Sequence, residues 1–216
     1  TYGSYTQVVN LAAPHILEFA LSDEILDLAE IYLGSEPLLY SINTWWTSPN
    51  KSGITHRFHR DRDDFKMIVL YITWTPTEED DGCQYVINAT HCHSGIGGLT
   101  FQPKDSPRVH DIFEKISSEG GYGINSEPDL LEELKIHARP FYGEAGITHA
   151  IDTYALHSGT NCKKPRLMTW IRYGVTENFA YFDDKMHGQT PWPRLNLKGV
   201  NSRMKNVSKL LIDWGY

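Results

Sequence analysis

The sequence has little that would tie the protein to an oxidising compartment or to a membrane. Its three cysteines, Cys83, Cys92 and Cys162, are too few and too scattered for a disulfide framework. The longest uninterrupted apolar run, residues 67–72, is far shorter than a membrane span. The N-terminal residues lack the basic flank and apolar core of an export signal. We therefore expect a cytoplasmic protein that has no membrane partner.

Positive charge is also in short supply. The 216 residues include 20 lysines and arginines against 27 acidic residues, which gives a formal net charge of −7. That balance argues against a general binder of phosphate backbones, so we expect no nucleic-acid partner. A hydrophobic fraction of 40% is enough to bury a substantial core, and the length suits one large domain that spans residues 1–216.

Short strand-like runs separated by turn residues dominate the middle and the last third of the chain. The strongest is residues 66–74 (KMIVLYITW), which is rich in β-branched and aromatic side chains and precedes Pro76. Because the runs in the middle follow one another closely, they are typical of a β meander. Many short strands with few helices predict an antiparallel sandwich or barrel with helices packed on one side. The expected strands are 38–46, 55–61, 66–74, 84–88, 147–151 and 166–175.

A helix is predicted near the N-terminus and a shorter amphipathic segment near the C-terminus, at residues 204–214. The first covers residues 22–33, because Ser22 is suited to the N-cap and Gly34 to the position after the last turn. Its apolar stripe is expected to contain Ile25, Leu28, Ala29 and Tyr32 and to pack on the outside of a sheet.

A helical insertion is predicted within residues 103–140, between two of the strands. Ser106-Pro107 and Ser126-Glu127-Pro128 are typical helix starts, and three glycines lie between them. Helices inserted between strands, with glycines as a hinge, are a candidate lid over a site. A fixed helical cover over one face of the barrel is the alternative.

Two residues with metal-binding side chains are separated by a single position in His59-Arg60-Asp61. In an extended strand, residues i and i+2 point to the same face, so this imidazole and this carboxylate can reach one ion. Two nitrogen donors and one carboxylate on one face of an octahedron form the arrangement of non-haem iron oxygenases. A third ligand must therefore come from elsewhere in the chain.

His157 is the best candidate for that third ligand. It lies shortly before the strand at 166–175, which begins with Arg166 in an otherwise apolar context. A guanidinium in such a place needs an anionic partner, and a dicarboxylate bound through two parallel hydrogen bonds would supply one.

Two stretches of the sequence resemble the phytanoyl-CoA dioxygenase family. One contains residues 59–66 (HRDRDDFK), the strand around 71–73, an acidic turn, Gly82 and the end at 89–91. The other contains residues 152–160 (DTYALHSGT) and Arg166. The likeness covers approximately residues 38–91 and 143–175, in the order that the family has.

The resemblance implies a double-stranded β-helix, or jelly-roll, with iron(II) bound by His59, Asp61 and His157 at one open end. It implies 2-oxoglutarate as co-substrate, with its distal carboxylate on Arg166, and O2 as oxidant. A C–H bond of a small-molecule substrate would be hydroxylated, with release of succinate and CO2. Because Asp61 is present, hydroxylation is favoured over halogenation, for which relatives replace this carboxylate by a small residue.

Two further residues are weaker candidates for contacts with the co-substrate. Some relatives use a lysine on the strand of Lys66 to assist the distal carboxylate, although a solvated lysine is the alternative. Asn43, on the strand before the His-x-Asp motif, is the other candidate.

Other interpretations of the same residues remain open. A zinc-dependent hydrolase could use the same three ligands, and a jelly-roll that only binds its ligand needs none of them. His91-Cys92-His93 with Cys83 could form a zinc cluster, but no second pair has structural-zinc spacing. His56 is expected in a loop near the site. One of Trp45 and Trp46 could stack on a substrate, although core packing is favoured. Arg172 shares a strand face with Arg166 and could meet an anionic substrate, although a surface ion pair is favoured.

Overall fold

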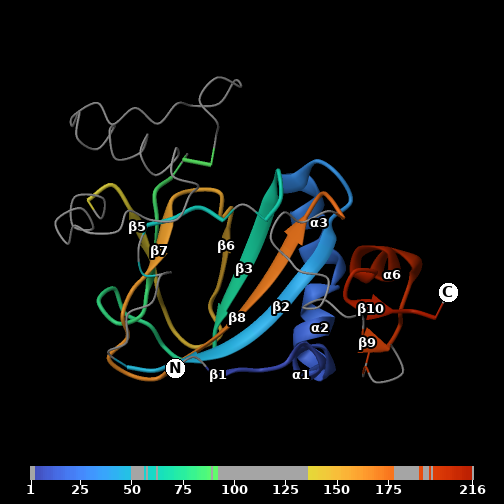
Figure 1. The fold of residues 1–216 in the computed structure, drawn as a ribbon, viewed down its shortest axis with the longest axis horizontal. Coiled ribbons are helices and arrows are strands. Elements are labelled where there is room, and N and C mark those ends of the chain that lie inside the picture. Colours follow the sequence, from blue (N-terminus) through green and yellow to red (C-terminus); the bar gives the residue numbers. More distant parts are fainter. Residues whose placement is uncertain are drawn as a thin grey trace.

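The protein is built around two antiparallel sheets (Figure 1). In this computed structural model the residues described are 3–49, 56, 58–61, 63–88, 90–91, 136–177, 190–191, 195 and 197–215. The larger sheet contains, in spatial order, β1 (Gly3–Ser4), β2 (Leu38–Thr47), β8 (Arg166–Gly174), β3 (Met67–Thr73) and β6 (Thr148–Ile151). The smaller sheet contains β5 (Arg139–Phe141), β4 (Gln84–Val86) and β7 (His157–Gly159).

The order of the strands shows that the predicted meander is wrong. β2 and β3 are successive strands of the larger sheet in the chain, yet each pairs with β8, which lies between them. Pairing of sequence neighbours is a tendency that long-range packing overrides. Of the predicted strand at 55–61, the described residues 56 and 58–61 form no strand, and His59 makes an isolated bridge to His157.

The two sheets face each other across a small apolar core. Val69 and Tyr71 of β3 and Met168 of β8 pack with Val86 of β4. The opposite face of the larger sheet is covered by a second and larger core, to which Ile68, Leu70, Ile72 and Ile171 contribute. Alternation along the strands therefore separates an inner face, between the sheets, from an outer face.

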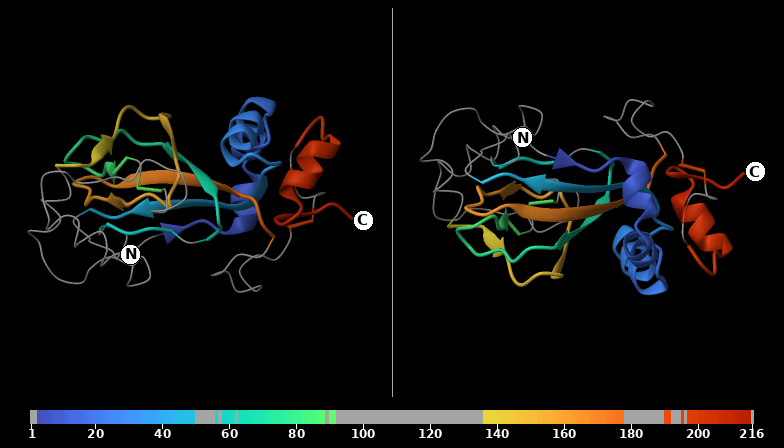
Figure 2. Two further views of the ribbon diagram at one scale, coloured as in Figure 1. Left: turned by 90° about the horizontal axis from the view of Figure 1, so that it is seen from above. Right: turned by 90° about the horizontal axis from the view of Figure 1, so that it is seen from below.

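Helices cover that outer face and no described helix lies on the smaller sheet (Figures 1 and 2). They are α1 (Gln7–Ala12), α2 (Pro14–Ala20), α3 (Asp23–Leu33) and α6 (Ser202–Ser208). Next to α6, β9 (Thr190–Pro191) and β10 (Ile212–Asp213) form a short parallel pair. A mainly β jelly-roll with helices packed on one side is thus confirmed, although α1 and α2 were not predicted from the sequence.

Helix α3 matches its prediction in extent and in most of its buried face. Ser22 is the N-cap in extended conformation, and Gly34 ends the helix with a φ of 78°. The buried positions include Leu26 and Leu33, whereas Leu28 is 44% exposed. Of the predicted stripe, Ala29 is buried and Ile25 and Tyr32 pack against the core, so Leu28 alone was misplaced. Helical spacing does not say where the edge of an apolar stripe lies.

Most of the predicted helical insertion lies outside the described residues. Only its end, residues 136–140, is described, and there Arg139 and Pro140 already belong to β5. The lid and the single domain therefore stay predictions. Within the described part of the chain, no helix is long and apolar enough to cross a membrane.

Candidate metal centre

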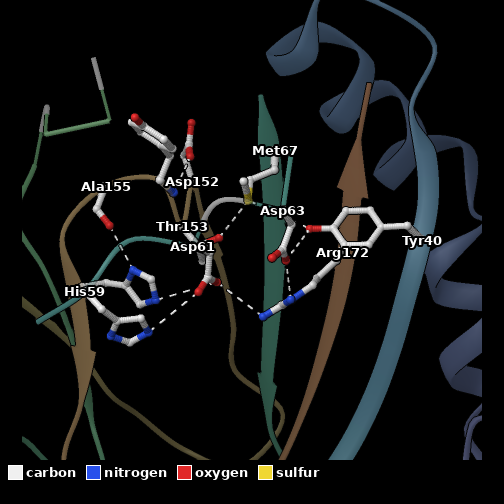
Figure 3. Close-up of polar contacts among 11 residues, drawn as sticks. Tyr40, His59, Asp61, Asp63, Met67, Asp152, Thr153, Ala155 and Arg172 are labelled. Carbon is white, nitrogen blue, oxygen red and sulfur yellow. Dashed lines mark hydrogen bonds and ion pairs between the residues drawn. The ribbon is translucent and has the colours of Figure 1, made fainter. Parts of the chain in front are cut away.

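Three side chains with metal-binding atoms converge at one end of the space between the sheets. One ligand atom each of His59, Asp61 and His157 lies within 4.8 Å of the other two. Nε2 of His59 is 3.8 Å from Oδ1 of Asp61 (Figure 3). Nε2 of His157 is 3.9 Å from Oδ2 of Asp61. These separations are too long for hydrogen bonds, and they suit atoms that share one ion.

Backbone hydrogen bonds bring the two distant parts of this cluster together. The N–H groups of His59 and His157 each donate to the carbonyl of the other, at 2.9 and 3.0 Å. The N–H of Asp61 donates to the carbonyl of Thr153 at 2.9 Å. His157 also begins β7 and pairs there with Val86 of β4. The site is therefore fixed by main-chain pairing on both sides of His157.

The ring of His157 is prepared to act as a ligand. Its Nδ1 lies 2.9 Å from the carbonyl oxygen of Ala155, and a carbonyl can only accept, so Nδ1 carries the proton. The lone pair is then on Nε2, which faces Asp61. Burial, followed by the charge of neighbouring His59, lowers the pKa of His157 to about 4. The ring is therefore neutral at pH 7, as metal binding requires.

Asp61 is an ionised carboxylate in a largely buried place. Burial acts to raise its pKa, but Arg172 and the two histidines together outweigh burial, so the pKa is lowered. Nη2 of Arg172 lies 3.3 Å from Oδ2 of Asp61, and Nη1 lies 2.5 Å from Oδ2 of Asp63.

The prediction of a surface ion pair for Arg172 is therefore wrong. The side chain is buried, and its partners are Asp61 of the metal cluster and Asp63, two positions further along the chain. Two signals in the sequence are consistent with this position. Arg172 is six residues after Arg166 and so lies on the same face of the strand, and Asp63 is two residues after Asp61.

A cavity of about 350 Å³ opens beside the three residues. Arg166 lies in its wall, buried, with Nη1 donating to the carbonyl of Gly82 and Nη2 3.5 Å from Oγ1 of Thr47. Asn43 of β2 lines the same cavity. The remaining lining residues are Ser4, Trp45, His56, His59, Asp61, Tyr71, Gln84, His157, Gly159, Trp170 and Arg172.

The structure does not bring every predicted residue to the cavity. Lys66 is absent from the wall: its ammonium lies 3.4 Å from the carbonyl of Leu33 at the end of α3 and 5.0 Å from the ring centre of Tyr32. The alternative of a solvated lysine fits this position, because Lys66 is exposed and on the helical side of the sheet.

The expectations for the aromatic and histidine neighbours are met in part. Trp45 lines the cavity and also packs against the inner core, whereas Trp46 is 38% exposed. His56 lines the cavity, with Nδ1 2.8 Å from Oδ1 of Asn161. Of the possible zinc cluster, Cys92 and His93 lie outside the described residues.

Comparison with known proteins gives a likeness of fold without a family. No family model matches the chain, and no curated protein matches its sequence. Among solved structures, the epimerase SnoN in complex with Fe3+, alpha ketoglutarate and nogalamycin RO aligns with a TM-score of 0.52 at 15% identity over 87% of this chain and 68% of SnoN. EctD from S. alaskensis aligns with a TM-score of 0.52 at 14% identity over 94% of this chain and 66% of EctD.

A third neighbour is the non-haem alpha ketoglutarate dependent carbocyclase SnoK from nogalamycin biosynthesis. It aligns with a TM-score of 0.52 at 12% identity, over 80% of this chain and 62% of SnoK. The chain thus spans about two thirds or less of the length of several proteins that it resembles. It covers 66% of AviO1, and 61% of SnoN in a second structure of that epimerase. What these likenesses establish is that the chain shares the jelly-roll fold of these three proteins.

Proposed function

We propose that the protein is an iron(II)- and 2-oxoglutarate-dependent oxygenase that hydroxylates a C–H bond of a small molecule. The observation that carries the proposal is the convergence of His59, Asp61 and His157 beside a cavity whose wall contains a buried arginine, Arg166. The likeness to SnoN, whose structure holds Fe3+ and alpha ketoglutarate, supports it. Membership of the phytanoyl-CoA dioxygenase family is part of the same proposal.

The donor set fits iron(II). Two imidazole nitrogens and one carboxylate oxygen suit a first-row divalent metal, and three ligands leave open positions for a co-substrate and a gas molecule. The ring of His157 is neutral, with its free nitrogen toward the carboxylate of Asp61. Asp61 is ionised, so these two groups have the protonation state that a metal ligand needs.

The cavity fits 2-oxoglutarate. Its volume of about 350 Å³ is within the range of small-molecule sites, roughly 300–1,000 Å³. In the proposal Arg166 binds the distal carboxylate through its planar guanidinium, and Asn43 contacts the co-substrate from β2.

The residues of the protein would bind and orient the co-substrate and the substrate, and they would exclude water from the cavity. When bound, iron and 2-oxoglutarate supply the oxidising power: O2 is consumed, and succinate and CO2 are released. Trp45, Tyr71 and Trp170 give part of the cavity wall an aromatic surface, which would keep water from the reacting atoms. The substrate's target carbon would be held against this wall, close to His59, Asp61 and His157.

The test is to add iron(II) and 2-oxoglutarate to the protein under anaerobic conditions. A visible charge-transfer band is expected, and O2 should bleach it as succinate forms. A zinc-dependent hydrolase would bind metal without this band, and a jelly-roll that only binds its ligand would show neither effect. Asp61→Ala is the matched variant, because it removes one ligand and leaves Arg166 intact. A screen for metabolites that stimulate succinate formation would then identify the substrate.

A further inference from the structure

Arg172 is held from three directions at the base of the candidate metal centre. Its guanidinium reaches Oδ2 of Asp63 at 2.5 Å and Oδ2 of Asp61 at 3.3 Å. Its central carbon lies 3.9 Å from the ring centre of Trp170, so the guanidinium also stacks on this indole. The side chain is 7% exposed. An arginine with these contacts has little freedom to move.

Asp63 is itself fixed, so the arginine has a rigid support. The hydroxyl of Tyr40 donates to Oδ2 of Asp63 at 3.2 Å, and both residues are buried. Tyr40 belongs to β2 and Arg172 to β8, which are paired strands of the larger sheet. The chain of contacts therefore runs from the sheet through Tyr40, Asp63 and Arg172 to Asp61 (Figure 3).

We propose that Arg172 is a positioning residue that fixes the carboxylate of Asp61 in the orientation needed for metal binding. The proposal rests on the proposed metal site. With Arg172 on Oδ2, the carboxylate cannot rotate freely about its Cβ–Cγ bond, and Oδ1 stays on the side of His59. Partners that orient a ligating carboxylate or imidazole contribute strongly to metal affinity.

A role in positioning Asp61 and a purely electrostatic role predict opposite changes in metal affinity when Arg172 is replaced. A cation 3.3 Å from Asp61 repels a divalent metal, and its loss would also leave the carboxylate of Asp63 without this partner. If Arg172 acted only through its charge, its removal would therefore tighten metal binding. If it positions Asp61, its removal weakens metal binding by about 10–100-fold.

The experiment measures cobalt(II) affinity from the visible absorption of the bound ion, without turnover. Arg172→Gln is compared with the wild type and with Arg203→Gln, at a temperature where circular dichroism shows all three folded. Arg203 is the matched control, because it pairs with Asp27 and Glu30 of α3 and lies outside the cavity wall. We expect weaker binding by about 10–100-fold in Arg172→Gln and unchanged binding in Arg203→Gln.

Unchanged or tighter binding in Arg172→Gln would overturn the positioning role. Should that variant not fold, Arg172→Lys decides the matter, because lysine keeps the charge but cannot contact both carboxylates through a planar fork. Weaker cobalt binding in Arg172→Lys supports the proposal, and wild-type affinity in this variant contradicts it. A wild type that binds no cobalt would instead refute the metal site itself, so the two failures are distinguishable.

Discussion

Thr44 and Thr169 lie opposite each other on β2 and β8, and their hydroxyl oxygens are 2.7 Å apart. The oxygen of Thr169 also accepts a hydrogen bond from the indole N–H of Trp74 at 2.8 Å. Both threonines are buried. One buried hydroxyl pair thus links the central strand of the larger sheet to β2 and to the end of β3.

Thr169→Val should lower the free energy of unfolding by about 1–3 kcal/mol, because the buried hydroxyl of Thr44 loses this partner. Urea unfolding measures the change. The double variant Thr44→Val/Thr169→Val should lose less than the sum of the two single variants, since both polar partners are then gone. Strictly additive losses would mean that the two hydroxyls do not interact.

Asp61→Ala and Arg166→Ala should affect two different binding steps, that of the metal and that of the co-substrate. Loss of the carboxylate should abolish hydroxylation and weaken iron binding, because one of the three ligand atoms is removed. Loss of the guanidinium should leave iron binding intact and raise the dissociation constant of 2-oxoglutarate by roughly 10–100-fold. Anaerobic titrations with iron(II) and then 2-oxoglutarate measure both constants. Equal loss of iron in the two variants would show that Arg166 has been given the wrong role.

Asp152 should make stability depend on pH in a direction opposite to that of a typical carboxylate. Burial raises its pKa above the usual value of an aspartate, and the facing groups Tyr32, Tyr154, His91 and Lys66 offset this only in part. A raised folded-state pKa adds stability below the unfolded-state pKa, and this stability is lost as pH rises through the folded-state value.

Asp152→Asn removes this ionisation and keeps an oxygen acceptor for the N–H of Tyr154. The stability of the variant relative to the wild type should therefore increase between about pH 3 and pH 7. Denaturant unfolding at several pH values gives the two curves. Parallel curves over this range would refute the expectation.

Gly174, the last residue of β8, leaves no room for a side chain. An added Cβ would clash with Oδ2 of Asp64 and lie 3.1 Å from its Cγ. That carboxylate cannot move away cheaply, because it accepts hydrogen bonds from the N–H groups of Val175 and Thr176 at 2.5 and 2.9 Å. Gly174→Ala should cost about 1–3 kcal/mol of stability.

Gly3→Ala is the matched control for this substitution. Gly3 also lies in a strand of the larger sheet, but nothing approaches within 4 Å of a Cβ added there. We expect a change within about 0.5 kcal/mol for this variant in the same thermal or denaturant assay. A change in stability for Gly174→Ala as small as that for Gly3→Ala would show that the clash with Asp64 is relieved without cost.

Local patterns in the sequence were enough to predict most of the regular elements. The run at 66–74 became β3, and the segment from Ser22 to Gly34 became α3 with both ends in place. These predictions succeeded because strand and helix periodicities and terminal residues act over a few positions. The same patterns missed α1 and α2, which are only six and seven residues long.

Long-range arrangement is where the sequence predictions failed. Nothing local indicated that β8 would lie between β2 and β3, and the expected meander was wrong for that reason. The assignment of Lys66 to the co-substrate also depended on the direction of its side chain, just before the first residue of β3. The structure turns this side chain toward α3 instead.

The sequence alone determined which residue types could make a metal centre, because the spacing of His59 and Asp61 and the order of His157 and Arg166 are properties of the chain. The tertiary structure decided that His157 reaches the other two, through its backbone bridge to His59. It also decided that Arg172 is buried against Asp61 and Asp63 and does not lie on the surface. The physical reason is that burial and charge pairing arise from contacts between segments about a hundred residues apart, which no local pattern encodes.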